Sequence, residues 1–118
     1  MQKPTGPNVI EMIPQRNVDF VRENNMVVLL APKFRNRILV RYIMPKMKQP
    51  HYPVLLDEFG TTVWDLIDGT RTVFEIGKML KAQHGEKVEP VFDRLGLFVN
   101  MLAQRRFISL SMSGMTAE

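Results

Sequence analysis

This sequence contains no cysteine and no long hydrophobic run. Without cysteine we expect no disulfide framework, thiolate metal site, iron–sulfur cluster or cysteine nucleophile. The longest apolar runs, such as Met26 to Ala31, are far shorter than the roughly 20 residues that cross a bilayer. The N-terminal residues lack the charged and apolar regions of a signal peptide. These absences predict a cytosolic protein without a membrane span, whose core is held by packing alone.

Residues that carry chemistry are also scarce. The two histidines, His51 and His84, stand 33 positions apart in different predicted elements, which is a poor spacing for a shared metal. The glycines stand singly, without the GxGxxG or GxxxxGK[ST] context that cradles a phosphate. No group of titratable residues has the pattern of a general acid and base. We therefore expect a protein that is not an enzyme and binds no metal, nucleotide or other cofactor.

The charge of the chain is unevenly distributed. The 118 residues, 45% of them apolar, suit one globular domain with a formal net charge of +4. One stretch contains six cations and no Asp or Glu, whereas the half from Pro53 onward is slightly acidic. Such a patch is either a solvated face or a docking surface for an anionic partner, which leaves protein, peptide and nucleic acid open. Its cations are Lys33, Arg35, Arg37, Arg41, Lys46 and Lys48.

The first half of the chain predicts strands. Residues 1–17 are rich in proline and read as an N-terminal arm with at most a short ordered piece. Val18 to Val21 and Met26 to Leu30 favour two strands of a hairpin, because the Asn24-Asn25 turn between them accepts positive φ.

A basic insert and a third strand follow. The basic insert, residues 33–52, is predicted to hold a short amphipathic helix over 35–44. Val54 to Leu56 then predict a third strand, whose flanking prolines suit the edge of a sheet. An edge strand leaves backbone donors and acceptors open to another chain.

The second half of the chain predicts helices. A helix over 57–67 has Asp57 as its N-cap and the Asp68-Gly69 pair as its stop. Thr72 and Glu75 form a capping box at the start of a second helix that ends at His84.

A third helix and a closing strand complete the order. Pro90 begins the helix, which runs to Gln104, and residues 107–110 return as a strand before a tail over 111–118. The pattern predicts one α+β domain over 18–110, winged-helix-like, with a three-stranded antiparallel sheet followed by three helices and a short closing strand. Its core is expected to contain Val63, Trp64, Ile67, Ile76, Leu80, Leu95, Phe98 and Leu102.

One run of residues resembles a known family. The sequence Trp-Asp-Leu-Ile-Asp-Gly-Thr-Arg-Thr-Val-Phe-Glu-Ile occupies 64–76, after Leu56-Asp57 and before the last helix and Phe107-Ile108. This order of strand end, helix, Asp-Gly turn and Glu-Ile helix resembles the PqqD family over about residues 18–110. Members of that family are winged-helix-like recognition elements that hold the leader of a ribosomal precursor peptide for a modifying enzyme, often a radical S-adenosylmethionine protein.

The resemblance implies a peptide-binding site. In the family the leader adds as a strand to the edge of the third strand and packs against the last helix, a form of β-augmentation. Carried over by position, the strand is Val54, Leu55 and Leu56, and the helix contributes Arg94, Leu97, Phe98, Met101 and Arg105. The partners implied are a precursor leader peptide and a modifying enzyme, with the six cations of the basic insert as a second docking surface and a homodimer left open.

The alternative function is DNA binding by a winged helix. A recognition helix should project several Arg, Lys, Asn or Gln side chains toward the bases. The last predicted helix and its end offer Arg94, Asn100, Gln104, Arg105 and Arg106. The second helix offers few such residues, and the helical half is slightly acidic. Peptide recognition is therefore the leading hypothesis, and nucleic acid is not expected to be the partner.

Overall fold

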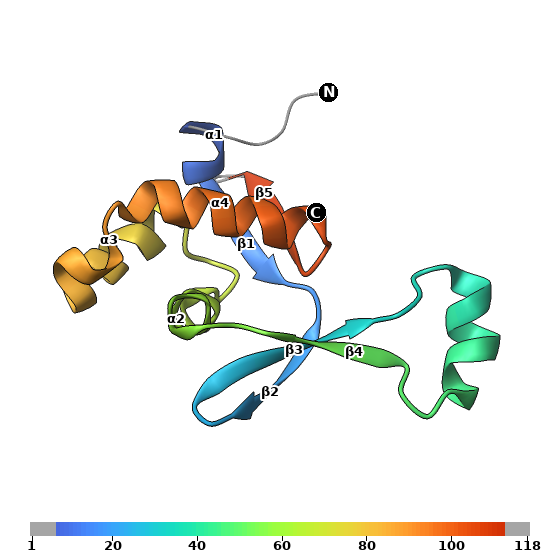
Figure 1. The fold of residues 1–118 in the computed structure, drawn as a ribbon. Helices are drawn as coiled ribbons and strands as arrows, with labels where there is room; N and C mark the ends of the chain where they lie inside the picture. Colours follow the sequence, from blue (N-terminus) through green and yellow to red (C-terminus); the bar gives the residue numbers. More distant parts are fainter. Residues whose placement is uncertain (1–6, 113–118) are drawn as a thin grey trace.

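Two antiparallel sheets are formed in the part of the chain that the structure, a computed structural model, describes, which is residues 7–112 (Figure 1). The larger sheet has three strands in the order β2-β3-β4, so β2 and β4 are its edges. The smaller sheet pairs β1 with β5. The strands are β1 (Met12–Arg16), β2 (Asp19–Glu23), β3 (Met26–Pro32), β4 (His51–Leu55) and β5 (Ile108–Met112).

The β2–β3 hairpin confirms the predicted turn. Asn24 and Asn25 have φ of 55° and 66°, the left-handed conformation that a two-residue turn between twisted strands requires. The register pairs Glu23 with Met26 directly across this turn. Both strands end two residues later than the sequence predicted, because backbone pairing continues past the apolar residues, and β2 begins one residue later, at Asp19.

Three helices follow one another between β4 and β5, and the first two begin where their capping residues predicted. Asp57 caps α2 by accepting a hydrogen bond from the Gly60 amide at 2.8 Å. Thr72 and Glu75 form the predicted capping box of α3. No helix within residues 7–112 is long and apolar enough to cross a membrane. The helices are α1 (Pro7–Ile10), α2 (Glu58–Leu66), α3 (Val73–His84) and α4 (Val91–Gln104), with 3-10 turns η2 (Met44–Lys46) and η3 (Gly85–Val88).

A single core lies between the three-stranded sheet and the helices. Trp64 of α2 is completely buried, as predicted, and its ring meets Phe20 of β2 edge-on at 5.9 Å. Seven of the eight predicted core residues are buried, and Phe98 is half-buried against the same cluster. The predicted α+β fold, with its three-stranded antiparallel sheet, three helices and closing strand, is confirmed.

The N-terminal segment differs from the arm that the sequence suggested. Val9 is buried in the core with 2% exposure, and β1 pairs with β5 along its whole length. Sequence periodicity missed β1 because Pro14 interrupts its pattern and its partner strand lies at the other end of the chain. The closing strand also extends to Met112, into the predicted tail; the rest of that tail, 113–118, and residues 1–6 of the predicted arm lie outside the described residues.

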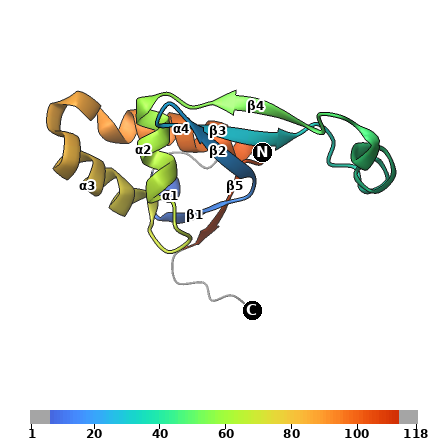
Figure 2. The ribbon, with the colours of Figure 1, turned by 90° about the horizontal axis from the view of Figure 1, so that it is seen from below.

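The basic insert, bounded by the structure at residues 33–50, joins β3 to β4 and stands away from the helices (Figures 1 and 2). It is helical as predicted, but as a π-helix, η1 (Leu39–Ile43), followed by the 3-10 turn η2. Pro45 has no amide hydrogen and cannot continue a regular helical ladder, which accounts for the end of the π-helix at Ile43. The third strand begins at His51, earlier than predicted, includes Pro53 and ends at Leu55, one residue before the predicted end at Leu56.

Candidate functional site

Helix α4 presents two different faces. Val91, Leu95 and Val99 belong to a fully buried stripe that packs into the core. A neighbouring stripe, at helical spacing, is only partly buried and borders β4. This second stripe consists of Arg94, Leu97, Phe98 and Met101.

A groove of about 510 Å³ lies between this stripe and the end of β4. Its floor and walls are mainly apolar, and two leucines stand at its mouth with most of their surface in solvent. Leu55 on β4 is 74% exposed and Leu97 on α4 is 75% exposed. Apolar side chains exposed this far mark a surface that another molecule can cover. The lining residues are Val54, Leu55, Leu56, Asp57, Phe59, Arg94, Leu97, Phe98 and Met101.

Among residues 7–112, no strand pairs with the outer edge of β4, and this free edge lies beside the groove. The Leu56 amide donates to the Val27 carbonyl at 2.9 Å, and at the other end of the ladder the Lys33 amide donates to the Pro50 carbonyl at 2.9 Å. Because backbone groups of an antiparallel strand alternate in direction, the even-numbered residues of β4 face β3 and the odd-numbered residues face outward. The backbone groups of His51, Pro53 and Leu55 therefore point to the open edge. Proline at 53 removes a donor from this edge without removing a bond from the sheet.

Arg94 and Phe59 form one wall of the groove. The Arg94 guanidinium lies over the Phe59 ring, with Cζ 4.1 Å from the ring centroid, and its Nη1 donates to the Lys87 carbonyl at 3.2 Å. Phe59 in turn meets Phe98 edge-on at 6.1 Å. These contacts fix the direction of the guanidinium, so a cation stands at one end of an apolar groove.

A smaller pocket of about 290 Å³ adjoins the groove at this cation. The two cavities share Asp57, Phe59 and Arg94 as lining residues. The smaller pocket is the more polar, because charged side chains of both signs and a histidine border it. They are Glu58, His84 and Lys87, in addition to the shared Asp57 and Arg94.

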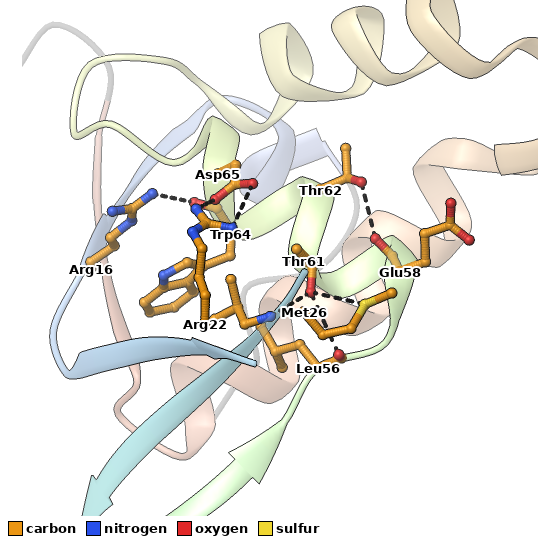
Figure 3. Close-up of polar contacts among 10 residues, drawn as sticks. Arg16, Arg22, Met26, Leu56, Glu58, Thr61, Thr62, Trp64 and Asp65 are labelled. Atoms are coloured by element: carbon orange, nitrogen blue, oxygen red, sulfur yellow. Dashed lines mark hydrogen bonds and ion pairs between the residues drawn. The ribbon is translucent and has the colours of Figure 1, made fainter. Parts of the chain in front are cut away.

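The hydroxyl of Thr61 connects α2 to the strands that carry the groove (Figure 3). Its Oγ1 accepts from the Val27 amide at 2.9 Å and lies 3.5 Å from the Leu56 carbonyl oxygen. In a regular ladder the Val27 amide would bond to Leu56 directly, so the hydroxyl is inserted into the last rung between β3 and β4. This contact fixes Leu56, the last strand-side residue of the groove, against the start of α2.

The other end of α2 is held by two arginines (Figure 3). Arg16 donates to the Trp64 carbonyl at 2.8 Å and lies over the Trp64 ring, 5.4 Å from its centroid. Arg22 on β2 forms an ion pair with Asp65 that raises the pKa of its guanidinium. With both ends attached to strands, α2 supports the wall that contains Phe59.

The structure brings seven of the eight predicted peptide-contacting residues to this one groove. Arg105 is the exception, because α4 ends at Gln104 and the exposed Arg105 does not line the groove. Sequence reasoning missed Asp57 and Phe59, although the helical start at Asp57 placed both next to the third strand. The six cations of the basic insert do not line the groove. Residues 7–112 contain no group of three potential metal ligands.

The model of the family described as coenzyme PQQ synthesis protein D (PqqD) matches residues 47–108, which is more than half of the chain. The chain belongs to this family. The PqqD match covers β4, the three long helices and every residue that lines the groove. Membership implies an accessory, peptide-binding role beside a partner enzyme. No curated protein and no solved structure matched the chain.

Proposed function

We propose that this PqqD protein binds the leader segment of a precursor peptide in the groove between β4 and α4 and delivers it to a modifying enzyme. The observation that carries the proposal is the free edge of β4 beside an apolar groove. An extended peptide satisfies such an edge with backbone hydrogen bonds, while its alternate side chains enter the groove. The enzyme is a radical S-adenosylmethionine protein in the systems that the family resemblance implies.

The alternation of β4 fixes the backbone contacts of the bound peptide. Leu55 and His51 each offer an outward amide hydrogen and carbonyl, whereas Pro53 offers a carbonyl only. The strongest pairing is therefore at Leu55, next to α4. A peptide strand that starts there needs only a few ordered residues, which limits the entropy lost on binding.

The groove also selects side chains. Leu55, Leu97 and Phe98 offer apolar surface to a large apolar residue of the peptide. Arg94, held by Phe59 at one end, offers a cation to an acidic residue nearby. We therefore expect a leader with an extended segment that is partly apolar and partly acidic.

A titration of the labelled chain with the cognate leader tests the proposal. Amide shifts are expected to cluster at Leu55 and along α4 at Leu97 and Phe98. Replacing Leu55 with proline removes an outward donor and should leave the fold intact while weakening binding by about tenfold or more. The matched control is Val54→Pro, which removes an inward donor and should destabilise the sheet instead. Shifts confined to the basic insert, with normal binding by Leu55→Pro, would show that the groove is not the site.

DNA binding receives less support from the site. The face of α4 that is open to a partner is largely apolar, with one cation at one end. The amide of Asn100, a residue that a DNA reader would use, has a buried oxygen within the described chain. Duplex DNA is therefore expected to bind only through salt-sensitive contacts to the basic insert, and nanomolar, sequence-specific binding that survives added salt would contradict the peptide proposal.

A further inference from the structure

The basic insert carries a charge that the rest of the described chain does not neutralise. It contains six Lys and Arg and no Asp or Glu. The other residues contain 16 less 6, or ten, cationic side chains against twelve acidic ones. Within residues 7–112, none of the six cations forms an ion pair. The positive field of the molecule is therefore concentrated on the insert.

The same insert exposes large apolar side chains. Ile38 is 66% exposed, Val40 41% and Tyr42 56%. In a helix with about four residues per turn, residues two positions apart lie on nearly opposite sides. Exposure at 38, 40 and 42 therefore means that neither side of the helix is covered. An apolar surface of this kind, rimmed by charge, is typical of an interaction site.

One side of the insert is hollowed. A shallow depression of about 530 Å³ is lined by Asn36, Arg37, Ile38, Arg41 and Tyr42. The Arg41 guanidinium lies over the Tyr42 ring, with Cζ 5.6 Å from its centroid. Two guanidinium groups beside an apolar surface suit a carboxylate with a neighbouring apolar side chain.

The insert is closed at its base by one backbone bond, contacts the rest of the fold through Arg35, and lies apart from the groove. At its base, the Lys33 amide bonds to the Pro50 carbonyl at 2.9 Å, and Arg35 donates to the Arg106 carbonyl at 3.2 Å. Its helical part projects beyond the ends of β3 and β4, away from α2 and α3 (Figures 1 and 2). The PqqD match begins at Met47, after this helical part. A partner can therefore occupy the insert while a peptide occupies the groove.

We propose that the basic insert is a second docking element, which binds an acidic cleft with an apolar floor on the enzyme that receives the peptide. The proposal rests on the proposed function only in naming that enzyme as the partner. A protein cleft suits the insert better than a lipid surface does. A flat surface covers one side of a helix, whereas a cleft can cover both sides on which Ile38 and Val40 are exposed. Binding at both sites would raise the effective concentration of the enzyme near the peptide.

Photo-crosslinking in the cells that produce the chain identifies the partner. A benzoylphenylalanine in place of Tyr42 is expected to crosslink to one modifying enzyme. The matched control carries the same residue in place of Phe74, which is 45% exposed on α3, and should not crosslink to it. The captured enzyme is then produced pure and used as the probe. Failure to crosslink any protein at 42, or equal capture from 42 and 74, would overturn the proposal.

Binding of the pure enzyme by the full chain measures the docking. The double variant Arg37→Ala/Arg41→Ala should weaken binding by about tenfold and reduce its salt dependence, because cations at the edge of an interface mainly affect association. Ile38→Ala/Tyr42→Ala should raise the dissociation rate. The control Lys78→Ala/Lys81→Ala removes two cations of α3 and should change binding less than twofold. Unchanged binding by both insert variants would overturn the proposal.

Two further measurements separate this proposal from the other possibilities. Leu55→Pro should bind the enzyme normally while losing the leader peptide. This variant therefore tests peptide binding in the groove separately from enzyme docking on the insert. Vesicles of three parts phosphatidylcholine to one part phosphatidylglycerol should not retain the chain at physiological salt. Retention on these vesicles that depends on Ile38 and Tyr42, without a crosslinked enzyme, would overturn the protein partner in favour of an anionic membrane.

Discussion

The Arg94 guanidinium lies over the ring of Phe59, with Cζ 4.1 Å from the ring centroid. Arg94 comes from α4 and Phe59 from the first turn of α2, so the contact closes one end of the groove. It also separates the apolar groove from the smaller polar pocket, because both residues line both cavities. The cation is therefore placed where a peptide leaving the apolar surface would meet it.

Replacing Arg94 with alanine should weaken binding of an acidic leader by about tenfold and lower the salt dependence of its association. The matched control is Arg105→Ala, which removes the same charge from a position that does not line the groove. That variant should bind within about twofold of the original protein. Calorimetric titrations at two salt concentrations measure both effects. An equal loss for the two variants would mean that the peptide reaches beyond the end of α4.

Gly60 permits the close approach of α2 to α4. A Cβ at this position would lie 3.0 Å from Cζ of Phe98 and 3.2 Å from Cβ of Leu56, both of which line the groove. Gly60→Ala should therefore displace the Phe98 ring and weaken peptide binding by about tenfold. The variant should lose less stability than binding energy, because the higher helix propensity of alanine, about 1 kcal/mol over glycine, offsets part of the steric cost.

The control for this prediction is Gly96→Ala. Gly96 lies in the middle of α4, and a Cβ there would meet nothing within 4 Å. This variant should gain stability by about 0.5 to 1 kcal/mol and bind the peptide normally. Thermal unfolding and peptide titrations of the two variants provide the comparison. Normal peptide binding by Gly60→Ala would show that the position of Phe98 does not limit the site.

Local signals in the sequence predicted most of the helical half. The caps at Asp57 and Thr72 and the turn at Gly69, with φ of 85°, each depend on residues within four positions of one another. The groove face of α4 could also be predicted, because Arg94, Leu97, Phe98 and Met101 share one side of any helix over these residues.

Contacts between distant segments were not predictable in the same way. The pairing of β1 with β5 joins Met12 to Met112, and no local pattern signals a partner so far along the chain. Arg105 shares the helical spacing of the groove residues, and only the end of α4 at Gln104 removes it from the groove. Phe59 was missed because its role comes from the packing of α2 against α4 and not from its own neighbours in the sequence.

The turn between α2 and α3 should make stability depend on acidic pH. Amide hydrogens of Thr70 and Arg71 both donate to Oδ1 of Asp68 at 2.9 Å, and these bonds lower the pKa of Asp68 from 3.8 to about 2. Because the folded pKa is the lower one, the contribution of Asp68 is full above about pH 4 and is lost as the pH falls toward about 2.

Variants of Asp68 test this dependence. Asp68→Ala should be less stable than the original protein near neutral pH, and the difference should shrink between about pH 4 and about pH 2. Asp68→Asn retains an acceptor oxygen and should lose less stability than the alanine variant. Urea unfolding at several pH values measures the differences. A difference for Asp68→Ala that stays constant over this range would contradict the assignment.

The Thr61 hydroxyl should support both the sheet and the groove. Thr61→Val keeps the volume of the side chain but leaves the buried Val27 amide without its acceptor. An unsatisfied buried donor costs about 1 to 3 kcal/mol. Thr61→Ser keeps the hydroxyl and loses one methyl group, which costs about 1 kcal/mol when buried. We therefore expect the serine variant to be the more stable of the two in urea unfolding.

Peptide binding by the Thr61 variants separates a local effect from a general one. Without the hydroxyl, the Val27 amide must either bond directly to the Leu56 carbonyl or remain without a partner. Both changes move Leu56 at the floor of the groove. The folded Thr61→Val protein should therefore bind the leader several-fold more weakly, whereas Thr61→Ser should bind it normally. If Thr61→Val is destabilised but binds with unchanged affinity, the hydroxyl stabilises the fold without positioning the groove. If Thr61→Val is instead as stable as the original protein, the Val27 amide has found another acceptor and the inserted rung is not required.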